Sequence, residues 1–110
     1  MGSKYIYEFT TKSAKDLDAI LKYISLELRN PKAAKDFLDK VEDCISILTD
    51  FPESGERVEN EYLTSFDVRR KIVGNYILFY QNDKDLKVIR ILTIFFGRMN
   101  IKQILKNLNI

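Results

Sequence analysis

The chain has 110 residues, 45% of them hydrophobic and 31% charged, with a net charge of +2, which is the composition of one ordinary globular domain spanning residues 1–110. It contains no histidine and one cysteine, Cys44, which excludes a Ser-His-Asp triad, a histidine acid or base, a Cys/His zinc site and an internal disulfide. No apolar run approaches the roughly 20 residues of a membrane span, and nothing requires an oxidising compartment, so we predict a cytoplasmic protein with no membrane contact.

The first residues predict a strand followed by a helix. Aromatic residues recur with a period of two, which is typical of a short strand with an aromatic face: Tyr5, Tyr7 and Phe9. The segment 13–16 then has the pattern of a helix start, with the Ser13 hydroxyl as its cap. Apolar residues follow at helical spacing and predict a helix that ends near Arg29: Ala14, Leu17, Leu21, Ile24 and Leu28.

A second helix is predicted directly after the first. Asn30 is a favourable N-cap, and Pro31 suits the first helical position, where its missing N–H costs nothing. Phe51 and Pro52 end this helix, and its apolar stripe consists of Ala34, Phe37, Leu38, Val41, Ile45 and Leu48. So short a connection predicts an antiparallel helical hairpin. Cys44 lies beside the stripe, and we interpret it as a small core or boundary residue and not a reactive thiol, because no cation is evident next to it.

The second half of the chain predicts strands and a last helix. Residues 52–65 are acidic and lack periodicity, which indicates a loop, and strands are predicted at 66–73, 76–82 and 86–95. Gly74 and Asn75 suit the first hairpin turn, since both accept positive φ. The last strand is almost entirely apolar and is expected to be covered on both faces. Asn100 can cap a short final helix with an apolar side made of Ile101, Ile104, Leu105 and Leu108.

The predicted order of elements is therefore β-α-α-β-β-β-α. We predict a two-layer α+β domain in which the helical hairpin packs on one face of a small antiparallel sheet. The final helix completes the core in the preferred interpretation. In the alternative it detaches, and a helix from a partner takes its groove.

Charge is distributed unevenly along the chain. Residues 1–65 carry nine Lys and Arg against thirteen Asp and Glu, whereas residues 66–110 carry nine against three. Alternation along 66–73 predicts that Arg69 and Lys71 face outward together, and that Arg70 lies under the helices and needs a partner or an edge position. With Arg90 and Arg98, the outward pair would form a basic patch for phosphates or for the carboxylates of a protein partner. The alternative is an ordinary solvated surface.

A metal-free nuclease would need cations, a base and an acid around the scissile phosphate. The candidates for charge stabilisation are Arg69, Arg70, Lys71 and Arg98. No histidine is available as the acid, and Tyr76 and Tyr80 are predicted to be core residues and not base-stacking platforms. We therefore leave the protein's status as an enzyme open and prefer the non-catalytic interpretation. No glycine-rich phosphate loop or carboxylate pair of metal-binding spacing is present, so neither a cofactor nor a metal is predicted.

From Tyr5 to about Leu108 the chain resembles the RelE/ParE superfamily of toxins from bacterial type II toxin–antitoxin modules. The resemblance rests on short motifs in a common order: residues 13–17, 30–34 and 48–52, the hairpin 69–80, and Phe96-Gly-Arg-Met-Asn100. It implies the α+β fold expected above, a cognate antitoxin as partner, and growth inhibition when that antitoxin is degraded. In this superfamily, RelE-like members cut mRNA in the ribosomal A site, whereas ParE-like members inhibit DNA gyrase.

The chain departs from the nuclease branch and is more similar to ParE-like members. Ile77 stands where nucleases often have an arginine, Phe96 where many have a histidine, and Ile104 where the last helix can supply a tyrosine. Catalytic groups act as a unit, so these losses should remove most of the rate. The resemblance thus implies a toxin that binds its target, DNA gyrase, and is covered by an antitoxin. Its interaction surface would consist of Arg69, Lys71, Arg90 and Arg98. The alternatives are a ribosome-dependent mRNA endonuclease and a non-toxic relative that only binds the antitoxin.

Overall fold

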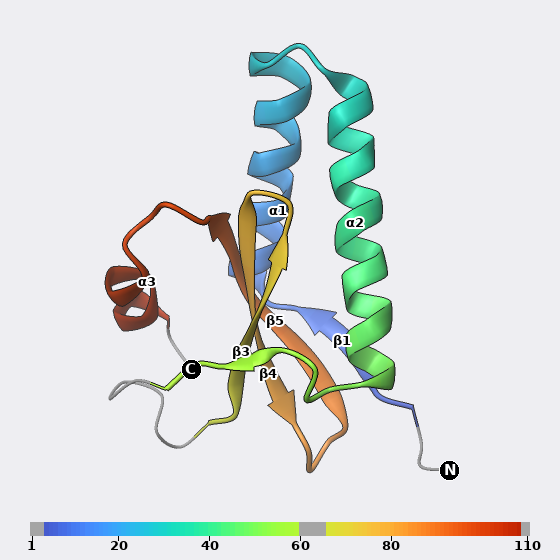
Figure 1. Cartoon of the computed structure of the whole chain (residues 1–110), viewed down its shortest axis with the longest axis vertical. Coiled ribbons are helices and arrows are strands. Elements are labelled where there is room, and N and C mark those ends of the chain that lie inside the picture. The colour runs from blue at the N-terminus through green and yellow to red at the C-terminus, as the bar shows by residue number, and fades with distance from the viewer. Residues whose placement is uncertain (1–3, 60–65, 109–110) are drawn as a thin grey trace.

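The computed structural model describes residues 4–59 and 66–108 (Figure 1). Its elements are β1 (Ile6–Phe9), α1 (Thr11–Lys22), η1 (Tyr23–Glu27), α2 (Pro31–Asp50), β2 (Glu56–Arg57), β3 (Val68–Val73), β4 (Tyr76–Asp83), β5 (Val88–Phe96) and α3 (Ile101–Asn107). Element η1 is a π-helical continuation of α1. The predicted order is confirmed, and the two-residue strand β2 is added within the segment predicted to be a loop.

The strands form one mixed sheet in the order β1-β5-β4-β3-β2. Strand β4 runs antiparallel to β3 and β5, whereas β1 runs parallel to β5, with Ile6 opposite Val88 and Phe9 opposite Ile91. The prediction of a purely antiparallel sheet is therefore wrong at β1. Side-chain alternation shows that a strand exists, but it carries no information on the direction of a neighbour from the far end of the chain.

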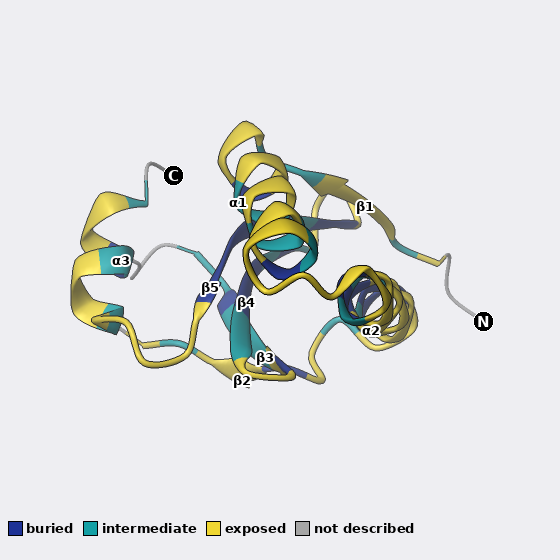
Figure 2. Ribbon diagram, turned by 90° about the horizontal axis from the view of Figure 1, so that it is seen from above, coloured by how far each residue is buried: buried dark blue, intermediate teal, exposed yellow. Residues whose placement is uncertain are grey.

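The helical hairpin and α3 lie on opposite faces of the sheet (Figure 2). The hairpin side holds one core cluster, which includes Val41, Ile45 and Leu48 of α2 with Tyr80 and Ile91 of the sheet. On the other side, α3 packs against a second cluster through its buried Leu105; the sheet residues of this cluster are Val68, Phe79, Leu92 and Phe95. The α+β prediction is confirmed for hairpin and sheet, and α3 adds a partial third layer that covers the second face of β5.

The first turns of α1 are anchored to β5. The helix begins before the predicted start, and its cap is Thr10, whose hydroxyl oxygen accepts the N–H of Ser13 at 3.1 Å. Ser13 is fully buried, and its hydroxyl donates to the carbonyl oxygen of Ile91 at 2.7 Å, so it is an anchor and not the cap. One turn further, Asp16 accepts a hydrogen bond from the Thr93 hydroxyl at 2.6 Å. These bonds hold the hairpin at a set position on the sheet.

Helix α2 begins and ends where the sequence predicts. The side chain of Asn30 caps it, Pro31 is its first residue, and Phe51 follows its last turn. The apolar stripe predicted for the first helix is correct only in its middle, because Ala14 and Leu28 are exposed. The three residues between them pack against the core on the hairpin side of the sheet.

The predicted turn after β3 and the predicted cap of α3 each depend on one or two residues, and the structure agrees with them except at Asn75. Gly74 has a φ of 60°, whereas Asn75 does not adopt positive φ. The side chain of Asn100 accepts the N–H of Gln103 at 3.2 Å and caps α3 as predicted. No helix in the described ranges is both long enough and apolar enough to cross a membrane.

Candidate functional site

The predicted cations lie on both faces of the sheet and do not form one patch. Along β3, Arg69 and Lys71 lie on the side of the helical hairpin, together with the buried Val73. Arg70 lies on the α3 side, together with Val68. This reverses the faces assigned from alternation. Both faces of β3 carry apolar residues, so the local pattern does not identify the face that the hairpin covers.

Arg69 holds the segment before β2 against β3. Its side chain is 15% exposed, and its Nε donates to Oδ1 of Asp67 at 3.0 Å. Its Nη1 donates to the carbonyl oxygens of Glu53 and Gly55, each at 3.0 Å. These acceptors all belong to the chain itself, so Arg69 has a structural position and not the outward one that the alternation predicts.

Tyr80 ties down the same segment from inside the core. It is fully buried, its hydroxyl donates to the carbonyl oxygen of Pro52 at 2.8 Å, and it accepts the N–H of Gly55 at 2.9 Å. Burial raises the pKa of Tyr80 to about 12, because it disfavours the phenolate. The prediction that Tyr76 and Tyr80 belong to the core is confirmed, with Tyr76 partly buried.

Arg90 and Arg70 are also paired within the chain. Arg90 lies on the α3 side, where its Nε donates to Glu8 of β1 at 2.6 Å and its Nη1 to Asp83 at 3.3 Å. The hydrogen bond to Glu8 raises the pKa of Arg90 above its usual value. Arg70 donates to Glu56 of β2 at 2.7 Å. These two arginines therefore join the edge strands to the rest of the sheet.

Two predicted cations, Lys71 and Arg98, make no ion pair within residues 4–59 and 66–108. Arg98 is exposed just beyond β5, and Lys71 is half-buried beside α2, where it lines a hollow with Cys44. Cys44 packs against the core as predicted, but the predicted absence of a cationic neighbour is wrong. Burial raises the pKa of the Cys44 thiol and outweighs the lowering by Lys71.

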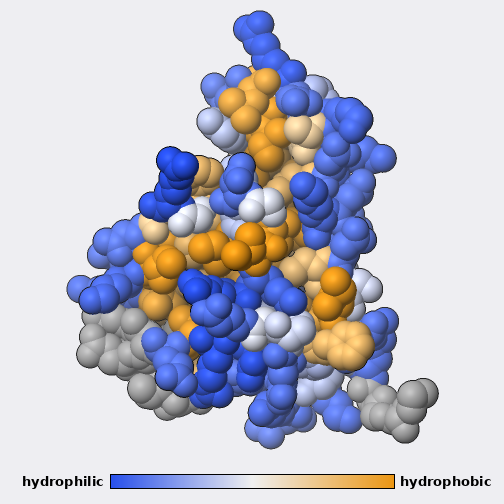
Figure 3. All heavy atoms as spheres, viewed as in Figure 1, coloured by the Kyte–Doolittle hydropathy of each residue, from blue (hydrophilic) through white to orange (hydrophobic). Residues whose placement is uncertain are grey.

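Apolar side chains reach the surface near Lys71. Figure 3 shows hydrophobic residues gathered across the middle of the face seen in Figure 1, between hydrophilic surfaces. Ile47 of α2 is 49% exposed and lines the hollow of about 270 Å³ that contains Lys71. Ile72 of β3 is 78% exposed and borders the same hollow, but alternation along β3 puts its side chain on the α3 side. An exposed apolar surface beside an unpaired cation is typical of a protein-binding region.

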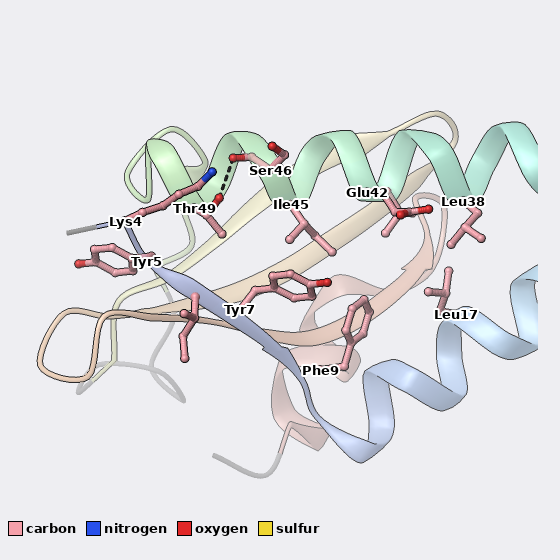
Figure 4. Close-up of a pocket in the computed structure, with 12 residues that line it drawn as sticks. Lys4, Tyr5, Tyr7, Phe9, Leu17, Leu38, Glu42, Ile45, Ser46 and Thr49 are labelled. Carbon is pink, nitrogen blue, oxygen red and sulfur yellow. Dashed lines mark hydrogen bonds between the residues drawn. The ribbon is translucent and has the colours of Figure 1, made fainter. Parts of the chain in front are cut away.

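A groove of about 700 Å³ lies between β1 and α2 (Figure 4). The rings of Tyr7 and Phe9 of β1, and that of Tyr5 just before it, line the groove and lie beneath α2. The α2 wall is a stripe at helical spacing that consists of Leu38, Val41, Glu42, Ile45, Ser46 and Thr49. The aromatic alternation of Tyr5, Tyr7 and Phe9 is the one signal of this groove in the sequence, and it does not by itself predict a groove.

The groove runs beside an open edge of the sheet. Among the strands of the described residues, β1 pairs with β5 alone. The N–H groups of Ile6 and Thr10 donate to the β5 side, so the backbone groups of Tyr7 point away from the sheet. Ile6 is 65% exposed and Tyr7 53% exposed. No proline or lysine interrupts this edge within Ile6–Phe9, which favours the addition of a further strand or segment.

A family model for the ParE toxin of the type II toxin–antitoxin system, parDE, matches residues 7–101 of the chain. The solved structure of a chromosomal ParDE toxin–antitoxin system from P. aeruginosa is similar, with a TM-score of 0.63 and 23% identity over 84% of this chain and 96% of that chain. A search of curated proteins gives no significant match.

Two solved RelE–RelB-type complexes share the fold. The archaeal RelE–RelB complex from Pyrococcus horikoshii OT3 gives a TM-score of 0.62 and 20% identity, covering 89% of this chain and 100% of that chain. The toxin–antitoxin complex RelBE2 from Mycobacterium tuberculosis gives a TM-score of 0.55 and 25% identity, covering 86% and 99%. The similarity therefore extends over nearly the whole of these chains.

Proposed function

The chain belongs to the ParE toxin family of type II toxin–antitoxin systems, and on this premise we propose that it inhibits bacterial growth by binding DNA gyrase, without catalysis of its own. A cognate antitoxin neutralises it by occupying its surface. Gyrase as the target also places the toxin in the cytoplasm.

Most of the candidate catalytic groups are bonded or buried within the chain itself, and this observation supports target binding over mRNA cleavage. Arg69 and Arg70 bond to groups of their own chain. Tyr80 is buried with a pKa raised to about 12, so it is a poor acid for a leaving group at neutral pH. Of the four cations considered for a nuclease site, Lys71 and Arg98 make no ion pair with the described residues and can contact an external anion. Two separate cations without a partner acid or base favour recognition and not phosphoryl chemistry.

We assign target contact to the surface around Lys71. Its neighbour Ile47 supplies exposed apolar area, and Lys71 supplies a charge that makes no ion pair with the described residues. Arg98 is exposed just beyond β5 and is assigned as a second cation for target contact. Interfaces of this kind combine an apolar centre with a few charges that orient the partner.

We assign the antitoxin to the groove between β1 and α2. The solved neighbours are described as toxin–antitoxin systems or complexes. In this chain the groove combines an apolar lining with an open strand edge, which suits a docked peptide segment. Helix α2 also borders the hollow that contains Lys71, so an antitoxin seated in the groove needs only to cross this helix to reach the target surface.

Pulse labelling after induced expression without antitoxin tests the target. Thymidine and methionine incorporation are followed separately, and we expect thymidine incorporation to fall first. An earlier fall of methionine incorporation would indicate the ribosome and overturn the gyrase proposal. Primer extension on cellular mRNA checks the same point, since cuts within codons would identify a nuclease.

Purified gyrase tests the assigned surface. The double variant Lys71→Ala/Arg98→Ala should lose most of its inhibition of supercoiling while keeping its thermal stability. The matched control, Lys15→Ala/Lys35→Ala, removes the same charge from exposed helix positions and should inhibit like the parent chain. Equal inhibition by all three proteins would show that this surface does not contact the target.

A further inference from the structure

Glu42 is a charged residue in the otherwise mainly apolar wall that α2 contributes to the groove. It is exposed and lies between Leu38 and Ile45 on the side of α2 that lines the groove (Figure 4). The other charged residue of the lining, Lys4, pairs with Asp50 at 3.3 Å. Among the described parts of the chain, no cation lies within ion-pair distance of Glu42.

The other carboxylates around α2 differ from Glu42 in their surroundings. Asp36 pairs with Lys32 at 2.9 Å on the exposed side of the helix. Asp43, the next residue after Glu42, lines the hollow on the β3 side, where Lys40 and Lys71 are also present. Glu42 therefore combines a position in the apolar groove with the lack of a cation from its own chain.

A segment that fills the groove would cover Glu42. A carboxylate taken out of water without a partner costs several kcal/mol, and a cation placed beside it offsets that cost. A charge of this kind in a docking groove therefore discriminates between segments, since it accepts one that brings a cation and disfavours one that does not.

We propose that Glu42 selects the cognate antitoxin: the antitoxin segment in the groove is apolar and carries a Lys or Arg side chain that pairs with Glu42. The inference rests on the proposed neutralisation of this toxin by an antitoxin in the groove. It names the chemistry of the partner, namely aliphatic or aromatic side chains against Tyr7 and Ile45 and one cation over α2.

Titration calorimetry between the toxin and the product of the neighbouring antitoxin gene tests the proposal. Glu42→Gln removes the charge and should raise the Kd about tenfold, and Glu42→Lys reverses it and should raise the Kd about a hundredfold or more. Asp36→Lys is the matched control, because it makes the same charge change at an exposed position of the same helix that lines neither the groove nor the hollow. We expect its Kd to stay within about threefold of the parent value.

A charge exchange completes the test. Each Lys and Arg of the antitoxin is replaced in turn by Glu, and one of these variants should bind the Glu42→Lys toxin more tightly than the unmodified antitoxin does. Thermal unfolding should be nearly unchanged in all toxin variants, since both positions are exposed.

The outcomes separate the inference from the proposed function. Unchanged affinity of Glu42→Lys, or an equal loss in Asp36→Lys, overturns the role of Glu42 while antitoxin neutralisation stands. Failure of the parent toxin to bind the antitoxin overturns the proposed function itself. A toxin dimer that Glu42→Lys dissociates would identify a second copy as the occupant and overturn the inference.

Discussion

Replacing Tyr80 with phenylalanine removes one oxygen atom from the core and leaves the ring in place. That hydroxyl bonds to the carbonyl oxygen of Pro52 at 2.8 Å and to the N–H of Gly55 at 2.9 Å. Gly55 is buried, so its N–H loses its partner at a cost of about 1–3 kcal/mol, and the second bond contributes about 0.5–1.5 kcal/mol. We expect a loss of about 2–4 kcal/mol in the free energy of unfolding, which lowers the Tm by roughly 8–15 °C for a domain of this size.

Alkaline pH provides a second signature of the same hydroxyl. The pKa of Tyr80 is about 12 in the folded chain, against about 10 for an unfolded tyrosine. The folded state keeps this proton after the unfolded state has lost it, so stability is fully present below about pH 10 and declines as the pH rises toward about 12. The shift of about two units corresponds to about 3 kcal/mol in the free energy of unfolding. The Tyr80→Phe variant has no hydroxyl to ionise, so it does not lose this amount as the pH rises.

Thermal unfolding followed by circular dichroism at pH 7.5 and pH 11 measures both effects. The control is Tyr76→Phe, because the Tyr76 hydroxyl makes no hydrogen bond with the described residues and its loss should change stability by less than about 0.5 kcal/mol. If Tyr80→Phe unfolds at the parent temperature, or both variants lose stability equally, the hydroxyl does not hold the 52–55 segment and the reasoning fails.

Three further variants test the packing and the groove. Gly55→Ala places a Cβ 2.5 Å from the Tyr80 hydroxyl, so we expect a loss of about 2 kcal/mol or more in urea unfolding, and a parent-like midpoint would contradict this. Arg69→Met should cost about 2–4 kcal/mol through the loss of its buried hydrogen bonds, whereas Arg98→Met should change stability by less than about 0.5 kcal/mol in the same assay. Ser46→Trp fills the groove at an exposed position and should weaken antitoxin binding at least about tenfold at an unchanged Tm; unchanged binding would place the antitoxin elsewhere.

The local elements of the fold could be predicted because their causes lie within a few residues. Asn30 and Pro31 start α2, Gly74 supplies the positive φ of the β3–β4 turn, and Asn100 caps α3. Each depends on a cap, a fixed φ or a missing N–H, which sequence neighbours determine. The start of α1 was misassigned because Ser13 has the chemistry of a cap, and only its burial against β5 shows that its hydroxyl bonds elsewhere.

The candidate site was less predictable, because the partners of its cations come from distant segments. Alternation identified Arg69 and Lys71 as residues of one face, and they do share one. It did not identify which face the hairpin covers, nor that Arg69 bonds to the carbonyl oxygens of Glu53 and Gly55. The groove was missed for the same reason, since its two walls are a strand and a helix that the sequence keeps apart.

The types and order of the elements, and the exclusion of histidine and Cys/His zinc chemistry, follow from composition, periodicity and local caps, and all of these can be read from the chain. Its motifs also indicated the toxin family. Three features require the folded chain: β1 lies parallel to β5, Arg69 and Arg90 are paired inside the chain, and Glu42 lies in the groove without a cation from the described residues. Those features depend on which distant segments meet, and long-range packing and ion pairing settle that only when the whole chain is folded.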